Sequence, residues 1–269
     1  MSDMKYPHDM PVVLTYGGGT NSSAILVELI KRGYPAPDLI VFADTGAERP
    51  HTYAHIGIMS MYAQNNGYPE ILIVKNNQPS KKGGLYEMCM HYGRLPAVAY
   101  GFKSCSYQYK IEPVRKLIED RLGKKTTYLK IVGYDSGESR RVSSAAGKET
   151  EYQTNWYPLI EWGMGRDECI DSLIGAGVPI AGKSSCFMCP NSRQQEVRDL
   201  VRQYPEYKIK IIDLENRAWD ASLADGIVPR VVGLGRSWRW TDMLSNVDMF
   251  DAPDINADMP CGCYDGEDD

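Results

Sequence analysis

The chain has no long hydrophobic run, only four histidines and no excess of basic residues, and these absences exclude several classes of protein. No apolar stretch is long enough to cross a bilayer, and the first residues, MSDMKYPHDMP, lack the apolar core of a signal peptide. We therefore expect a cytoplasmic protein with no membrane partner. The formal net charge is −5, so overall charge does not favour nucleic-acid binding, and only a local basic patch would support it.

The cysteines are odd in number, which argues against a disulfide scaffold. Seven occur among 269 residues, with no secretion signal. In a reducing compartment, closely spaced cysteines more often indicate metal or redox chemistry. The seven are Cys89, Cys105, Cys169, Cys186, Cys189, Cys261 and Cys263.

The sequence does contain an alternation of short apolar strands and helical patterns. Its 43% of hydrophobic and 24% of charged residues are ordinary for a soluble globular protein. Strands are expected at 12–16, 38–44, 70–75 and 127–134, and helices at 22–32, 52–66 and 110–122. This alternation predicts an α/β fold with a doubly wound parallel sheet, whose ligands bind at the carboxyl ends of the strands.

The strand signal fades beyond about residue 160, where helices are expected at 165–175, 191–203 and 205–223. We therefore divide the chain into three parts. They are a nucleotide-binding α/β domain (1–160), a helical, cysteine-containing metal and substrate region (161–245) and an acidic flexible tail rich in Pro and Gly (246–269).

The first strand leads into a glycine-rich loop, YGGGTNSS, at residues 16–23. The backbone N–H groups of such a loop and the following helix N-terminus can bind a phosphate, although a tight turn without a ligand uses the same residues. No Gly-Lys-Ser/Thr ends the loop, so it is not a P-loop, and Ser22 stands where a dinucleotide fingerprint has its last glycine. The loop resembles the pyrophosphate-binding loop, Ser-Gly-Gly-x-Asp-Ser, of the adenine nucleotide alpha-hydrolase superfamily.

Five further segments resemble the same superfamily, and in particular its phosphoadenosine phosphosulfate (PAPS) reductase family, in the expected order. They are FADTGAERPHTY (42–53), KSCSYQYKIEPVRKLI (103–118), VGYDSGESRRV (132–142), YPLIEWGMGRDECIDSLIGAGVPI (157–180) and SSCFMCPNS (184–192). With the loop they cover roughly residues 11–195. The resemblance implies an adenine nucleotide alpha-hydrolase-like sheet. It also implies an activity of the sulfonucleotide reductase or N-type ATP pyrophosphatase kind.

The resemblance implies which residues bind the nucleotide, either ATP or PAPS. The phosphates would lie between the loop and an arginine pair, and the ribose or a Mg²⁺ ion would lie at the end of the second strand. The implied residues are Tyr16, Gly17, Gly18, Gly19, Thr20, Asn21, Ser22, Asp44, Thr45, Gly46, Arg140 and Arg141. Asn21 stands where the family loop has an acid.

Cys186 and Cys189 have the Cys-x-x-Cys spacing of a metal chelate, and the resemblance brings Cys105 near them. We expect these three thiols to bind a [4Fe–4S] cluster or Zn²⁺, the alternative being three buried thiols without a metal. The iron–sulfur reductases of the family have a Cys-Cys pair where this chain has Ser104 and Cys105. Either a three-cysteine cluster leaves one iron open to sulfide or substrate, or a fourth ligand comes from Cys89, His91, Cys261 or Cys263. Cys169, within an apolar helical pattern, is predicted to lie in the core.

The tail holds the expected catalytic residues, Cys261 and Cys263. The PAPS reductases use a Cys-Gly segment near the C-terminus as the nucleophile, and Cys261 with Gly262 resembles it. One version of the function reduces a sulfonucleotide with the help of a thiol reductant protein. The other adenylates a nucleic-acid or small-molecule acceptor with ATP, releases pyrophosphate and passes on sulfur from a donor. The alternative is a non-catalytic nucleotide-sensing or metal-stabilised binding module, which the absence of the loop acid favours.

One more motif, GLGRSWRWTDML (233–244), interleaves cations and aromatic rings. Such residues either stack on bases and pair with phosphates or anchor the packing of a helix, and the sequence leaves both interpretations open.

Overall fold

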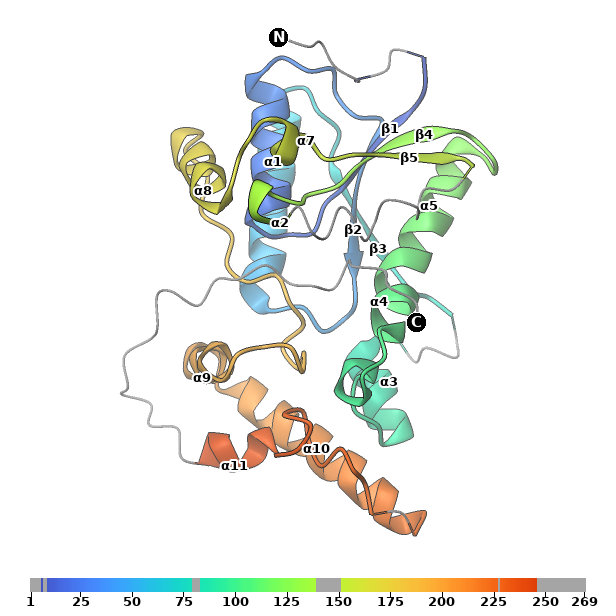
Figure 1. Ribbon diagram of the computed structural model, residues 1–269, viewed down its shortest axis with the longest axis vertical. Helices are drawn as coiled ribbons and strands as arrows, with labels where there is room; N and C mark the ends of the chain where they lie inside the picture. The colour runs from blue at the N-terminus through green and yellow to red at the C-terminus, as the bar shows by residue number, and fades with distance from the viewer. Residues whose placement is uncertain (1–5, 7–8, 79–82, 139–150, 227, 246–269) are drawn as a thin grey trace.

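The computed structural model of the chain describes residues 6, 9–78, 83–138, 151–226 and 228–245 (Figure 1). Its five strands form one sheet in which every pairing is parallel, in the order β3-β2-β1-β4-β5. The strands are β1 (Val12–Thr15), β2 (Leu39–Asp44), β3 (Ile71–Lys75), β4 (Tyr128–Ile131) and β5 (Gln153–Trp156). The predicted α/β class and parallel sheet are confirmed. The strand order changes direction at β1, as it does in Rossmann-like sheets.

The helices follow the strands closely along the chain. They are α1 (Thr20–Lys31), α2 (Pro50–Asn65), α3 (Leu85–Tyr92), α4 (Ser104–Ser106), α5 (Glu112–Leu122), α7 (Pro158–Glu161), α8 (Arg166–Gly175), α9 (Gln194–Gln203), α10 (Glu206–Ala224) and α11 (Trp240–Ser245). A π-helical segment, Tyr107–Ile111, joins α4 to α5. Strand β5 and helix α3 are additional to the predicted elements. No helix in the described part of the chain is both long and apolar enough to span a membrane.

The sheet is covered on both faces because its strands alternate buried apolar side chains. On one face, Leu14, Ile40 and Ile131 pack in a core cluster with α1, α2 and α8. On the other face, Val13 and Val41 pack with residues of α5. Figure 1 shows the same three layers, with α1, α2 and α8 on one side of the sheet and α5 on the other.

A second core lies beyond the sheet, where α3 packs with α9, α10 and α11. Its centre includes Trp240, which is buried, and the carboxylate of Glu215 on α10. That carboxylate accepts hydrogen bonds from the backbone N–H groups of Leu234 (2.7 Å), Trp240 (2.9 Å) and Thr241 (2.8 Å). The Arg- and Trp-rich motif at 233–244 therefore anchors helix packing, and its Trp240 is not available for base stacking.

The segment Ala181–Cys189 links the two cores, and we call it the connecting segment. At its start, the hydroxyl of Thr20 on α1 donates to the carbonyl oxygen of Ala181 (3.3 Å). Next, the Nε2 atom of His51 on α2 lies 3.0 Å from the Lys183 carbonyl oxygen. Beyond these contacts, the N–H of Phe187 donates to the Ala47 carbonyl oxygen (2.8 Å), just after β2. The segment thus runs from the glycine-rich loop to the carboxyl end of β2.

Candidate functional site

The glycine-rich loop joins β1 to the N-terminus of α1 and has no room for a side chain at Gly18. This residue has a φ of +73°, in the left-handed region that favours glycine. A Cβ atom there would lie 2.9 Å from the Thr52 side chain and 3.2 Å from the Phe42 ring. Local geometry therefore requires glycine at position 18. The loop places the first N–H groups of α1 at the carboxyl edge of the sheet.

A buried chain of hydrogen bonds supports the loop from beneath. The Ser23 hydroxyl donates to the Gly19 carbonyl oxygen (2.9 Å). It also lies 2.7 Å from the Tyr16 hydroxyl and 2.8 Å from the His55 Nε2 atom. Because a serine hydroxyl has one proton, Tyr16 and His55 act as donors to it. Burial, with a smaller effect of the charge of His51, lowers the pKa of His55 to about 4, so this imidazole is neutral at neutral pH.

Asn21, which replaces the acid of the resembling loops, lies against two other carboxylates. Its side-chain Nδ2 donates to Asp135 Oδ2 (3.0 Å) and to Glu138 Oε2 (3.1 Å), both from the stretch after β4. Its Oδ1 atom is buried and has no hydrogen-bond partner among the described residues. Two acids from another part of the chain, Asp135 and Glu138, therefore lie beside position 21.

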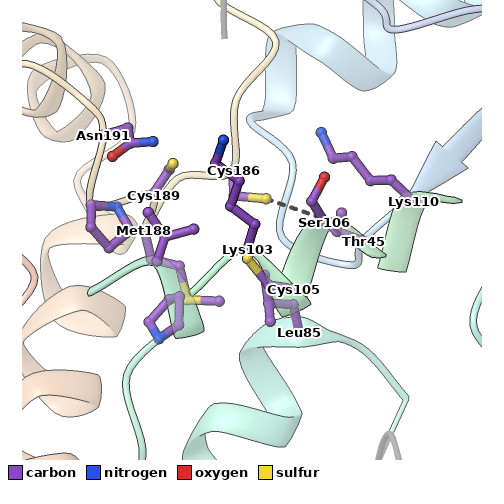
Figure 2. A pocket seen from close by; sticks show the side chains of 13 residues that line it. Thr45, Leu85, Lys103, Cys105, Ser106, Lys110, Cys186, Met188, Cys189 and Asn191 are labelled. Carbon is purple, nitrogen blue, oxygen red and sulfur yellow. Dashed lines mark hydrogen bonds between the residues drawn. The ribbon is translucent and has the colours of Figure 1, made fainter. Parts of the chain in front are cut away.

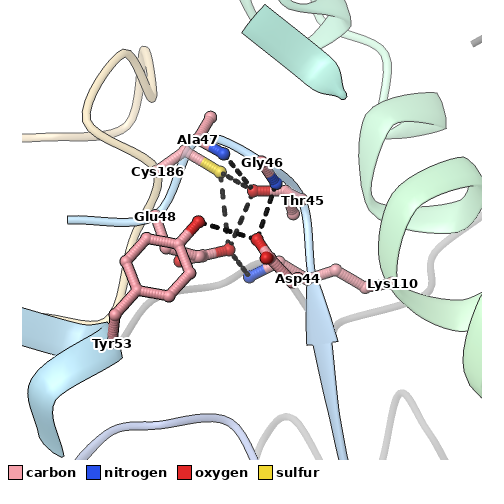
Figure 3. Close-up of polar contacts among 8 residues, drawn as sticks. All are labelled: Asp44, Thr45, Gly46, Ala47, Glu48, Tyr53, Lys110 and Cys186. Carbon is pink, nitrogen blue, oxygen red and sulfur yellow. Dashed lines mark hydrogen bonds and ion pairs between the residues drawn. The ribbon is translucent and has the colours of Figure 1, made fainter. Parts of the chain in front are cut away.

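Asp44, expected to hold a ribose hydroxyl or Mg²⁺, already has its carboxylate oxygens engaged (Figure 3). Oδ1 accepts from the Gly46 N–H and from the Tyr53 hydroxyl, both at 2.7 Å. Oδ2 pairs with Lys75 at 2.9 Å. A cation at Asp44 would have to displace the ammonium group of Lys75. In this structure Asp44 is therefore engaged by protein groups, and its role in holding a ribose hydroxyl or Mg²⁺ stays a prediction.

The three cysteines predicted as metal ligands line one cavity of about 50 Å³. Figure 2 shows Cys105 on α4, with Cys186 and Cys189 on the connecting segment that passes it. Lys103 and Lys110 also line the cavity. Cys169, in contrast, is fully buried in the first core, as predicted.

Cys186 is hydrogen-bonded into a buried polar cluster at the end of β2 (Figure 3). The Thr45 hydroxyl donates to Glu48 Oε1 (2.9 Å) and lies 3.3 Å from Cys186 Sγ. Since that hydroxyl proton is used by Glu48, the thiol is the donor to Thr45. Lys110 Nζ lies 3.7 Å from the same Glu48 oxygen, and these two side chains are 4% and 1% exposed. A thiol therefore lies beside a buried ion pair.

All three cavity thiols have their pKa raised by burial. The pKa of Cys186 lies well above its usual range, because the nearby charge of Glu48 adds to the effect of burial. The charge of Cys189 adds to burial at Cys105, whereas at Cys189 itself a backbone hydrogen bond and Lys110 partly offset it. Without a ligand, the thiols are therefore protonated at neutral pH.

The donor chemistry of this set fits an iron–sulfur cluster or zinc, because thiolates are preferred ligands of both. In this structure, however, the three thiols do not form a preformed metal site. No group of three or more Cys, His, Asp or Glu side chains within the described ranges is placed so that it could hold a metal ion. Of the fourth-ligand candidates, Cys89 is buried in the second core and His91 is exposed. We therefore derive no reaction step through a metal.

Four predicted residues lie outside the described part of the chain: Arg140, Arg141, Cys261 and Cys263. Conversely, Glu48, Lys110 and Asp135 belong to the site but were not singled out from the sequence. Each of them falls within a segment that carries the family resemblance, which is the signal that could have found them.

Comparison with known proteins adds no relative, since no protein-family model matches the chain and no curated protein matches it. Fold and site define an α/β protein with a five-stranded, all-parallel sheet, consistent with a Rossmann-like fold. Any more particular function rests on this chain's own residues.

Proposed function

We propose that the protein is an adenine-nucleotide-binding enzyme of the PAPS reductase family, with an adenine nucleotide alpha-hydrolase-like fold, and that it handles sulfur. One observation supports this most strongly. Three cysteines from distant parts of the sequence line one cavity, and the connecting segment that carries two of them begins against the glycine-rich loop. The connecting segment therefore joins the proposed phosphate-binding loop to the thiol cavity.

The nucleotide phosphates would bind at the N-terminus of α1, where unpaired N–H groups and the helix dipole favour an anion. For ATP, an acceptor nucleophile would form a bond to the α-phosphorus as the bond to the bridging oxygen breaks and pyrophosphate leaves. For PAPS, a thiolate would instead form a bond to the sulfonate sulfur as the S–O bond to the phosphate breaks and adenosine 3′,5′-bisphosphate leaves. A thiol of the reductant protein would then attack the modified cysteine, forming a disulfide as sulfite is released. Mg²⁺ would be held by Asp135 and Glu138, with the Asn21 amide turned so that its unpartnered oxygen faces the ion.

The nucleotide site can be tested by calorimetry with ATP and with PAPS on two matched variants. Gly18→Ala and Gly33→Ala both place a side chain at positive φ, +73° and +72°, but a Cβ atom at Gly33 meets nothing within 4 Å. Each change should cost about 1–2 kcal/mol of stability through backbone strain, and Gly18→Ala should cost more because its Cβ atom also meets Thr52. Only Gly18→Ala should also lose nucleotide binding. Unchanged affinity in Gly18→Ala would mean that the loop is only a turn.

The thiol site can be tested by measuring iron, sulfide and zinc in protein purified without oxygen. Serine at position 105, 186 or 189 should remove the metal, and Cys169→Ser, in the first core, should not. Equal metal content in all four variants would show that Cys105, Cys186 and Cys189 are not the metal ligands. A turnover assay for sulfite and for pyrophosphate then separates the two enzymatic versions. The absence of both products from protein that binds nucleotide would favour the binding module, with which the raised pKa of the thiols also agrees.

A further inference from the structure

Exposed aromatic rings are concentrated in one short stretch, residues 92–107, which we call the aromatic segment. Five large aromatic side chains are exposed in the described part of the chain, and four of them lie here: Tyr92, Tyr100, Phe102 and Tyr107. Phe102 is 67% exposed. The exposed aliphatic side chains, such as Met61 and Ile209, all lie elsewhere. The segment is therefore selectively aromatic rather than generally apolar.

The charge of this region is opposite to that of the whole protein. No Asp or Glu occurs between Glu87 and Glu112, although the chain has a net charge of −5. Two cationic side chains, Arg94 and Lys103, are exposed among the rings. This stretch therefore favours an anionic partner.

The segment is held in place and borders the thiol cavity. The Phe102 N–H donates to the Ala97 carbonyl oxygen (3.0 Å). At Gly93 a Cβ atom would lie 2.4 Å from Ala221, so the segment packs closely on α10. Lys103 and Cys105 line the cavity, and they lie in sequence between the exposed rings of Phe102 and Tyr107 (Figure 2).

We propose that the aromatic segment binds a single-stranded nucleic acid, with bases stacked on its rings and phosphates paired with its cations. Aromatic side chains interleaved with cations bind single strands in this way, because every base has a face that can stack. The exposed Lys103 favours a polyanion over a protein partner, because lysine is depleted at protein–protein interfaces. Strand binding itself requires no nucleotide. The inference rests on the proposed function only where it takes the bound strand to be the acceptor of the reaction.

Fluorescence anisotropy with labelled oligo-dT and oligo-U over a salt series tests the proposal. The variant Phe102→Ala/Tyr107→Ala should bind at least fivefold more weakly, as expected for loss of even one stacked base. Lys103→Ala should reduce the slope of log affinity against log salt by about one. The control Met61→Ala/Ile209→Ala removes similarly exposed aliphatic side chains elsewhere and should bind like the wild type.

The proposal is wrong if the wild type binds neither strand at low salt, or if the control variant loses as much affinity as the aromatic variant. It is also wrong if light scattering shows that the aromatic segment mediates self-association instead. ATP calorimetry on the same variants keeps the two proposals apart. If the strand does not bind while ATP binds normally, only the proposal for the aromatic segment is wrong. If the strand binds while ATP does not, only the proposed nucleotide site is wrong.

Discussion

Replacing His55 by Gln should remove a specific dependence of stability on pH. His55 is buried beneath the glycine-rich loop, where it donates to Ser23 and lies close to the N-terminus of α1. Protonation would place a full positive charge in a desolvated position, beside a helix end that already carries partial positive charge. The His55 imidazole therefore binds a proton less readily in the folded protein than in the unfolded chain.

The sign and size of the effect follow from the two pKa values. The pKa of His55 falls from an ordinary 6.5 to about 4 in the folded protein. The unfolded state binds more protons between these values, so stability is complete above pH 6.5 and is lost as the pH falls towards 4. At about 1.36 kcal/mol per pKa unit, the wild type should lose about 3 kcal/mol of unfolding free energy by pH 4.

Urea unfolding of both proteins at several pH values measures this directly. The carboxylates titrate in both, so the difference in unfolding free energy between wild type and His55→Gln isolates the imidazole. His91→Gln, at an exposed histidine, is the matched control and should show no such difference. If the difference between wild type and His55→Gln is constant from pH 7 to pH 4, the buried neutral imidazole is not as described.

Three further predictions concern other parts of the molecule. Glu215→Ala leaves three buried N–H groups without their acceptor and should lower the free energy of unfolding in urea by about 3 kcal/mol or more, whereas Asp220→Ala, on the exposed side of the same helix, should change it little. Asn21→Asp adds a third carboxylate beside Asp135 and Glu138, so the melting temperature should fall in chelator and rise more steeply with Mg²⁺ than that of the wild type; an equal response to Mg²⁺ would contradict the magnesium assignment. Truncation after Asn256 should leave nucleotide and metal binding intact but stop sulfite or pyrophosphate production, and full activity would show that Cys261 and Cys263 are not catalytic.

Most of the sheet was predictable because its first four strands are mainly apolar, although β4, YLKI, includes Lys130. Strand β5, QTNW, was not, because only one of its four residues is apolar and it forms as an edge strand through its pairing with β4. Helix α3, LYEMCMHY, mixes its apolar and polar residues over only eight positions, which is too short for a clear period.

The cysteines of the cavity were predictable from motif resemblance, but their surroundings were not. Glu48 follows a strand and Lys110 precedes a helix, positions where a charged side chain is normally solvated. Only the folded chain, with its π-helical segment before α5, brings Lys110 into a buried pair with Glu48 and next to Cys186. Partner choice of this kind depends on long-range packing, which local sequence does not specify.

The connecting segment also has a thermodynamic consequence. It contacts the helix end that would receive phosphates, and it carries two of the three cavity thiols. A ligand that prefers one placement of this segment therefore changes how readily the thiols receive a second ligand. The second ligand must change the affinity of the first by the same factor. Nucleotide titrations at two metal concentrations, and metal titrations at two nucleotide concentrations, would then yield a single coupling free energy, whichever ligand is added first.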